Sequence, residues 1–217
     1  MIVWGGCTTP AELPCDNLLS TGGRYNPSTD SWTATNTTNA PAGRESHTAV
    51  WTGDEMIVWG GCTATEFCVP TNTGSRYNPV TNSWIATSTA NAPIARTAHA
   101  AVWTDSEIVV WGGTNLLNRF STGGRYNPGT NSWTATSTIN APSAGGGHTA
   151  VWTDSEMIVW GGFGDSGDLN TGGRYCAQLG AATPTPTATP TPTATPTPCT
   201  GRCTPTPRPR PTPAPRP

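Results

Sequence analysis

The sequence predicts an all-β fold built from a repeated unit of about fifty residues. An apolar segment ending in Trp-Gly-Gly occurs four times, at 1–6, 56–61, 108–113 and 157–162. An Arg-Tyr pair follows each segment, and the tyrosines are Tyr25, Tyr77, Tyr126 and Tyr175. These tyrosines are 52, 49 and 49 residues apart. A fixed period of this length is typical of an array of units that bury their apolar faces against one another.

The unit over 96–136 displays the expected strands most clearly. They are 99–103, 107–111, 124–127 and 132–136. The first two are rich in apolar, β-branched and aromatic residues, as buried strands are, whereas the fourth is more polar. Pro, Gly and Asn before the fourth strand favour a tight turn. Four short antiparallel strands without helical periodicity are typical of one β-propeller blade, and the polarity gradient places the first strand innermost.

The recurring residues also carry a resemblance to a known family. Each full unit has Arg-x-x-His, an apolar strand ending in Gly-Gly, and then Arg-Tyr-Asn-Pro-x-Thr-Asn-Ser-Trp, over 44–84 and again over 96–133. This order resembles the kelch repeat, and the resemblance covers residues 1 to about 176. It implies that the histidine begins the innermost strand, and that the ring closes with five to eight blades. Gly145 departs from the pattern, because Arg44 and Arg96 stand at that position in the other units.

We therefore expect a kelch-type β-propeller segment over 1–178 with an incomplete ring. Its parts are a partial blade 1–41, a blade 42–90, a blade 91–140 and a partial blade 141–178. The first part lacks its innermost strand and the last lacks its outermost, which leaves fourteen strands and exposed blade edges open to self-association. Two copies would have the strand count of a seven-bladed ring, but their ends do not complete one blade. We expect instead a C-terminal part of a longer secreted protein.

Residues 179–217 are expected to form a disordered, Thr/Pro-rich linker or stalk. From Ala181 onward the chain has thirteen prolines in 37 residues and no aromatic residue. Such a segment cannot bury enough apolar surface to offset the entropy lost on ordering, so it favours extended, polyproline-like conformations.

The charge distribution excludes some partners. The body has seven arginines against thirteen acidic residues, and the chain has no lysine. Phosphate backbones require a basic face, so we expect no nucleic-acid partner. No run of eighteen apolar residues occurs, so we expect no transmembrane segment.

Six of the seven cysteines form close pairs, which predicts disulfides. The pairs are Cys7 with Cys15, Cys62 with Cys68, and Cys199 with Cys203. Zinc is the alternative, but CxxC spacing and neighbouring histidines are missing. Disulfides closing loops suit an oxidising compartment, so we expect an extracellular or cell-surface location. Cys176 is the seventh cysteine and stands outside these three close pairs.

Several polar residues recur in every unit, which favours structural roles over catalysis. His47, His99 and His148 are equivalent, as are Glu55, Glu107 and Glu156. We expect Arg76, Arg125 and Arg174 to lie over Trp59, Trp111 and Trp160 as cation–π pairs. Some kelch-like proteins are copper radical oxidases with a Tyr–Cys crosslink, but Tyr175 and Cys176 are adjacent and point to opposite faces of a strand. We expect no catalytic residue, no cofactor and no metal.

The loops between the second and third strands vary between units, and variable loops on a rigid scaffold are common recognition sites. They should emerge on the same face as the connections that carry the recurring arginines. The candidate partner-binding residues are Arg44, Glu66, Phe67, Arg96, Asn118, Arg119, Phe120, Asp165 and Asp168. Calcium binding by the two aspartates is the weaker alternative to simple solvation, and the alternative for the whole set is unselected drift of loop sequences.

These observations predict an extracellular binding or scaffold module that recognises a protein or a glycan through loops on one propeller face. One alternative is a fragment of a propeller enzyme whose catalytic residues lie in missing blades. Another is a non-functional, truncated gene product.

Overall fold

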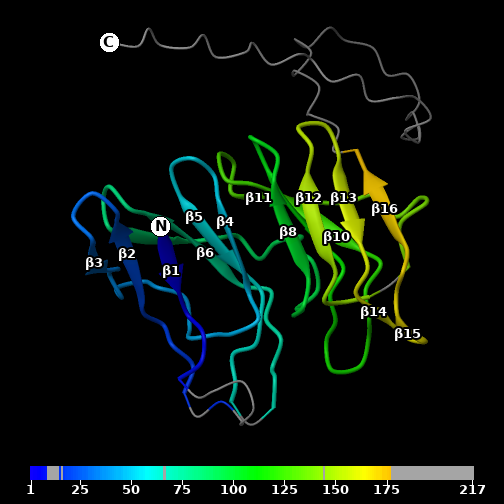
Figure 1. The fold of residues 1–217 in the computed structure, drawn as a ribbon, viewed down its shortest axis with the longest axis horizontal. Coiled ribbons are helices and arrows are strands. Elements are labelled where there is room, and N and C mark those ends of the chain that lie inside the picture. Colours follow the sequence, from blue (N-terminus) through cyan, green and yellow to red (C-terminus); the bar gives the residue numbers. More distant parts are fainter. Residues whose placement is uncertain (9–14, 16, 66, 144, 177–217) are drawn as a thin grey trace, which may run out of the picture.

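The computed structural model describes residues 1–8, 15, 17–65, 67–143 and 145–176. Within these residues the fold is all-β, and its main strands form four antiparallel sheets that follow one another along the chain (Figure 1). The sheets do not close into a ring. This confirms the expected all-β fold of antiparallel blades in an incomplete ring. The expected stalk over 179–217, with Cys199 and Cys203, lies outside the described residues.

Each sheet is a meander of consecutive strands. The first contains β1 (Ile2–Trp4), β2 (Gly22–Asn26) and β3 (Ser31–Ala34). The second contains β4 (Thr48–Trp51), β5 (Met56–Trp59), β6 (Gly74–Asn78) and β7 (Ser83–Ala86). The third contains β8 (Ala100–Trp103), β9 (Ile108–Trp111), β10 (Gly123–Asn127) and β11 (Ser132–Ala135). The fourth contains β12 (Thr149–Trp152), β13 (Met157–Trp160) and β16 (Gly172–Tyr175).

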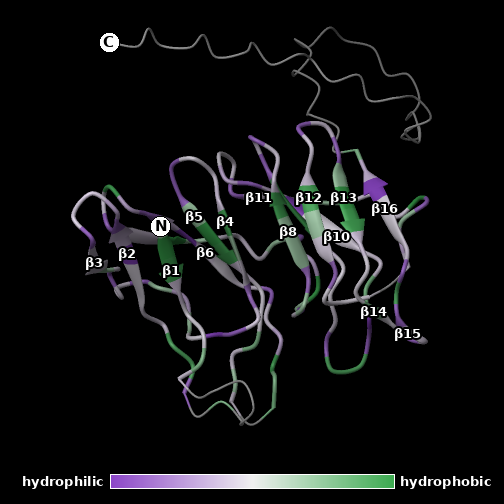
Figure 2. Ribbon diagram, in the orientation of Figure 1, coloured by the Kyte–Doolittle hydropathy of each residue, from purple (hydrophilic) through white to green (hydrophobic). Residues whose placement is uncertain are grey.

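Strand position in the sheet follows hydropathy. The orders β4-β5-β6-β7 and β8-β9-β10-β11 put the apolar strands toward one edge, and Figure 2 shows β1, β5, β8 and β13 as apolar ribbons and the ends of β2 and β16 as polar ones. Strand β8 contacts both β4 and β12, so the first strands of successive sheets are neighbours. The polarity gradient therefore predicted the inner-to-outer order correctly.

A short hairpin extends the fourth sheet's loop. Strands β14 (Phe163–Gly164) and β15 (Gly167–Asp168) pair antiparallel within the segment expected to be a variable loop. Gly167 has a φ of 112°, a backbone conformation that residues other than glycine rarely adopt. This conformation allows the chain to reverse between β14 and β15.

Neighbouring sheets pack through two kinds of face. We call the side that meets the next sheet the forward face and the opposite side the backward face. The forward face of the first three sheets presents a β-branched residue and a tryptophan, and the pairs are Ile2 with Trp4, Ile57 with Trp59, and Val109 with Trp111. The backward face of the second, third and fourth sheets presents residues such as Met56, Val58, Tyr77 and Trp84, or their equivalents. The apolar core therefore lies between sheets.

The expected arginine–tryptophan pairs are wrong. Arg76 lies opposite Ile57 in the strand register, and Gly74 is the residue opposite Trp59. The Arg76 guanidinium donates to the Pro128 carbonyl of the next sheet at 2.6 Å and lies 3.5 Å from Glu55. Trp59 packs instead against Trp133 and His99. Arg125 and Arg174 follow the same register, opposite Val109 and Ile158, and pair with Glu107 and Glu156.

Candidate functional site

The variable loops gather at one end of the molecule, here called the loop end. Figure 1 shows the segments between β1 and β2, β5 and β6, β9 and β10, and β13 and β16 at the lower edge, together with the connections between sheets. The turns carrying Asp54, Pro79, Asp105 and Pro128 lie at the opposite end. Strand direction dictates this segregation, because the chain runs toward the loop end in β1, β5, β9 and β13 and away from it in β2, β6, β10 and β16.

Arg44 and Arg96 form the framework beneath these loops. Only 1% of each residue's surface is exposed. Arg96 donates to the carbonyls of Ile94, Gly112 and Thr122, and it thereby ties the connection between sheets to both ends of the loop after β9. Arg44 donates in the same way to the carbonyls of Ala42, Gly60 and Thr73.

The assignment of Arg44 and Arg96 as partner-contacting residues is therefore corrected. Their guanidinium groups are buried, and backbone carbonyls of this chain take their hydrogen bonds. Burial lowers the pKa of each to about 10, so both remain charged at neutral pH. Each buried guanidinium donates to three carbonyls, so it holds the loops in place and is not available to a partner.

The recurring histidines pack at the contacts between neighbouring sheets. His99 is buried, and its Nε2 lies 2.9 Å from the hydroxyl of Thr48 in the preceding sheet. Its ring stands edge-on to Trp59, with centroids 5.2 Å apart. A Cβ added at Gly60, where φ is 70°, would lie 2.6 Å from the same ring. Burial, followed by the charge of Arg96, lowers the pKa of His99 to about 3. The expectation of a packing role agrees with this geometry.

Two disulfides close loops at this end, as the cysteine pairing predicted. Cys7 bonds Cys15, and Cys62 bonds Cys68. Cys62 also forms β-bridges to Glu45 and Pro70, so the second disulfide is anchored to the connection between the first two sheets. Glu45 lies within 4.8 Å of both sulfurs of the first disulfide. Because those sulfurs are bonded to each other, they are not thiolate ligands for a metal.

The third and fourth loops are joined by a charged and aromatic contact. Arg119 donates to the Asp165 carboxylate at 2.7 Å, and its guanidinium carbon lies 5.5 Å from the centre of the Phe163 ring. Phe120, the next residue, is half-buried against the Arg96 guanidinium at 4.5 Å. Arg119, Phe120 and Asp165 are thus brought together from two sheets, and calcium is not needed to explain Asp165.

The other candidates lie at the loop end but do not converge. Phe67 is 76% exposed at the second loop. Asn118 and Asp168 are exposed in the third and fourth loops. Glu66 lies outside the described residues.

Three apolar residues of the loop end were missed in the sequence. Leu116 and Leu117 are 68% and 89% exposed at the tip of the third loop, where Figure 2 shows an apolar colour. Phe163, in the next loop, is 37% exposed and contacts Arg119. The signal was available, because two adjacent leucines are unusual in a loop that otherwise contains polar residues.

A large, partly open cavity lies at the inner edge of the first sheet. It has a volume of about 540 Å³, and its lining includes Ile2, Arg24, Ala49, Trp51 and Met56. Strand β1 has no inner neighbour among the described residues, whereas β5 and β9 pair with β4 and β8. The cavity therefore occupies the place of an inner strand.

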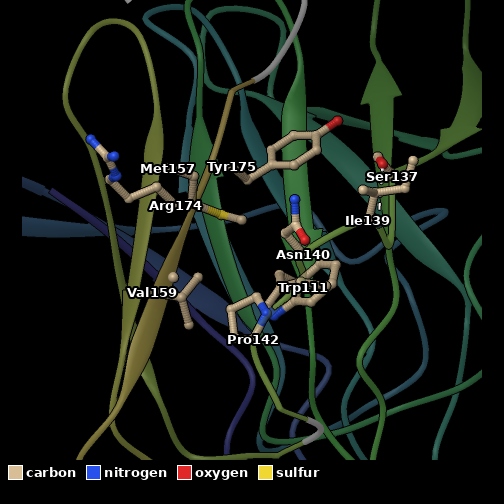
Figure 3. A pocket seen from close by; sticks show the side chains of 11 residues that line it. Trp111, Ser137, Ile139, Asn140, Pro142, Met157, Val159, Arg174 and Tyr175 are labelled. Atoms are coloured by element: carbon tan, nitrogen blue, oxygen red, sulfur yellow. Dashed lines mark hydrogen bonds between the residues drawn. The ribbon is translucent and has the colours of Figure 1, made fainter. Parts of the chain in front are cut away.

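A second, much smaller cavity lies between the third and fourth sheets. Trp111, Pro142, Met157, Val159 and Tyr175 line it (Figure 3), and its volume is about 20 Å³. At the other two junctions a tryptophan of the outer strand fills this position, as Trp84 does beside Trp4. No tryptophan follows Trp160 in the sequence. A space of this size is too small for an organic ligand.

Comparison with known families fits this architecture. A family model, described as the KLHDC2/KLHL20/DRC7 Kelch-repeats domain, matches residues 1–171. No curated protein matches the chain. None of the described segments forms a helix that is long and apolar enough to cross a lipid bilayer. The successive antiparallel meanders and the family match lead to one conclusion: the chain belongs to the Kelch-repeat family and is a protein-binding module of propeller blades.

Proposed function

We propose that the loop end binds an extracellular protein partner, and that the main contact surface is formed by the third and fourth loops. The observation that carries this proposal is the contact of Arg119 with Asp165 and Phe163, which joins loops of two sheets into one surface. The same loop as Arg119 also carries the exposed side chains of Leu116 and Leu117. An apolar tip next to charged groups is typical of protein contact sites, where apolar residues supply affinity and charges supply specificity.

The rigidity of the loops supports a recognition role. Buried Arg96 fixes both ends of the third loop, and the disulfides restrict the first two loops. Restricted loops lose little conformational entropy on binding, which favours affinity. The same disulfides support an extracellular location, because they persist in oxidising compartments.

A displayed library of random peptides tests the proposal. Peptides selected on the full chain should lose at least about tenfold in affinity on Leu117→Asp or on Arg119→Glu, since tenfold corresponds to one lost contact of about 1.4 kcal/mol. Val80→Asp is the matched control, because Val80 is 91% exposed at the opposite end. Selected peptides that bind the loop variants as tightly as the unchanged chain would contradict the assignment.

A glycan is the other ligand class that the loop end could recognise, with Phe67 as the exposed ring on which a sugar would stack. The same variants, together with Phe67→Ala, can be applied to a glycan array. Glycan binding lost only with Phe67→Ala would assign the surface to carbohydrate, whereas peptide binding lost with the third-loop variants assigns it to protein.

A further inference from the structure

Each end sheet of the molecule has one face that no other described sheet covers. On the first sheet this is the backward face, where Val3 is 47% and Trp32 is 53% exposed. On the fourth sheet it is the forward face, where Val151 is 56% and Trp160 is 60% exposed. Tryptophan and valine are costly to leave in water, so both faces are candidate interfaces.

The equivalent residues inside the arc are buried against one another. Trp59 and Trp111, the counterparts of Trp160, are 2% and 3% exposed. Trp84 and Trp133, the counterparts of Trp32, are 4% and 5% exposed. The contact between them is direct, since Trp4 meets Trp84 at 5.4 Å and Trp59 meets Trp133 at 5.2 Å between ring centroids. The two open faces are therefore the two halves of a junction that this chain already makes.

Polar groups of the open faces match in the same way. Arg24 and Arg76 each donate at 2.6 Å to a proline carbonyl of the following sheet, Pro79 and Pro128 respectively. The Arg174 side chain is 73% exposed, compared with 17% for Arg76, and it pairs with Glu156 of its own sheet. Pro27 of the first sheet has the sequence position of Pro79 and Pro128. An arginine donor thus lies on one open face and its proline acceptor on the other.

We propose that two copies of this chain bind head to tail through these faces. The forward face of the fourth sheet in one copy packs on the backward face of the first sheet in the other, so that Trp160 meets Trp32 and Arg174 reaches the Pro27 carbonyl. A second copy is the occupant because its surface repeats the one that the internal sheets bury. The contact is heterologous, and two copies that meet at both ends bring eight sheets together with neither end face left open.

The end junction is smaller than the internal ones. The first sheet has no inner strand among the described residues, so it offers no equivalent of Ala101 and Trp103, which pack at the junction between the second and third sheets. Assembly should therefore depend on protein concentration, and it should disperse on dilution.

Sedimentation velocity on the full chain tests the pairing through complementation. The unchanged chain should assemble as its concentration rises over about a hundredfold, the range across which mass action shifts such an equilibrium. Trp160→Glu and Trp32→Glu should each be monomeric when alone, because each has lost a different half of the contact. Mixed in equal amounts, they should form a dimer with one molecule of each. Val80→Glu, which changes an exposed residue away from both faces, should assemble like the unchanged chain.

Three results would overturn the proposal. A chain that stays monomeric throughout would mean that other blades or another protein cover these faces. Assembly by Trp160→Glu alone would mean that two first sheets meet each other, and assembly by Trp32→Glu alone would mean the same for two fourth sheets. Val3→Glu provides a second change to the first sheet, and circular dichroism confirms that each variant retains its strands.

Discussion

The guanidinium of Arg96 lies 4.5 Å from the ring centre of Phe120 while it donates to the carbonyls of Gly112 and Thr122. The buried guanidinium of Arg96 therefore fixes both ends of the third loop and also packs against Phe120 within that loop. The conformation of the loop end therefore depends on Arg44 and Arg96, which are buried beneath its surface. Gly145 takes this position in the next unit, where its carbonyl still accepts from the Gly113 amide.

Replacing Arg96 with methionine should lower the free energy of unfolding by about 3 kcal/mol, because the carbonyls of Ile94, Gly112 and Thr122 all lose a charged donor. Chemical denaturation measures the change. Arg119→Met is the matched control, since its pair with Asp165 is exposed and should contribute less than about 1 kcal/mol. Equal effects of the two substitutions would contradict a framework role for Arg96.

Acid should destabilise the fold through His99. Its pKa falls from 6.5 to about 3 on folding, mainly through burial and then through the charge of Arg96. Between these values the unfolded chain binds a proton that the folded chain does not, so stability falls as the pH is lowered through that window. The slope is about 1.4 kcal/mol for each pH unit and each proton.

Denaturation between pH 7.5 and pH 5, a range in which most carboxylates remain ionised, measures this slope. His47 and His148 also have lowered pKa values, chiefly through burial, and add to it in the same direction. His99→Gln should flatten the curve. A stability that is unchanged from pH 7.5 to pH 5 would show that protonating these histidines does not oppose folding.

Arg76 should contribute more to stability than its equivalent Arg174. Arg76→Ala removes a charged hydrogen bond to Pro128 and should cost about 2 kcal/mol. Arg174→Ala removes an exposed contact with Glu156 and should cost less than about 1 kcal/mol in the monomer. Thermal unfolding at a concentration low enough to exclude assembly measures both. Similar decreases in Tm for the two variants would contradict the inference that Arg76 stabilises the contact between neighbouring sheets.

The disulfide between Cys62 and Cys68 should restrict the second loop. Replacing both cysteines with serine should lower the free energy of unfolding by about 2 kcal/mol, the value expected for closing a short loop. Limited proteolysis should then cut the variant near Phe67, while the third loop should be cut at the same rate in both proteins. An unchanged cleavage pattern would mean that the neighbouring β-bridges alone fix the loop.

The repeat made the fold predictable from sequence. Periodic Trp-Gly-Gly segments, alternating apolar strands and Asn-Pro turns all indicate the same blade, and the strands occur where these signals place them. The arginine–tryptophan pairing failed because strand register depends on which residues face each other, and Gly74 rather than Arg76 lies opposite Trp59. Sequence spacing alone did not reveal that offset of two residues.

The loop end was only partly predictable. Variability pointed to the loops that the structure gathers at one end, and it named Arg119 and Asp165, which are 46 residues apart in the chain. It did not show that these two residues form a pair, nor that Arg44 and Arg96 lie beneath the surface. Both facts depend on the packing of one sheet against the next, which the sequence of a single repeat does not contain.

Hydrogen–deuterium exchange of the full chain with a library-selected peptide tests the central claim, that recognition occurs at the loop end, most directly. Amides of 114–120 and 163–169 should be protected when the peptide binds, and the opposite turns at 79–82 and 128–131 should exchange as before. Protection of those opposite turns, with no change in the third and fourth loops, would contradict the account.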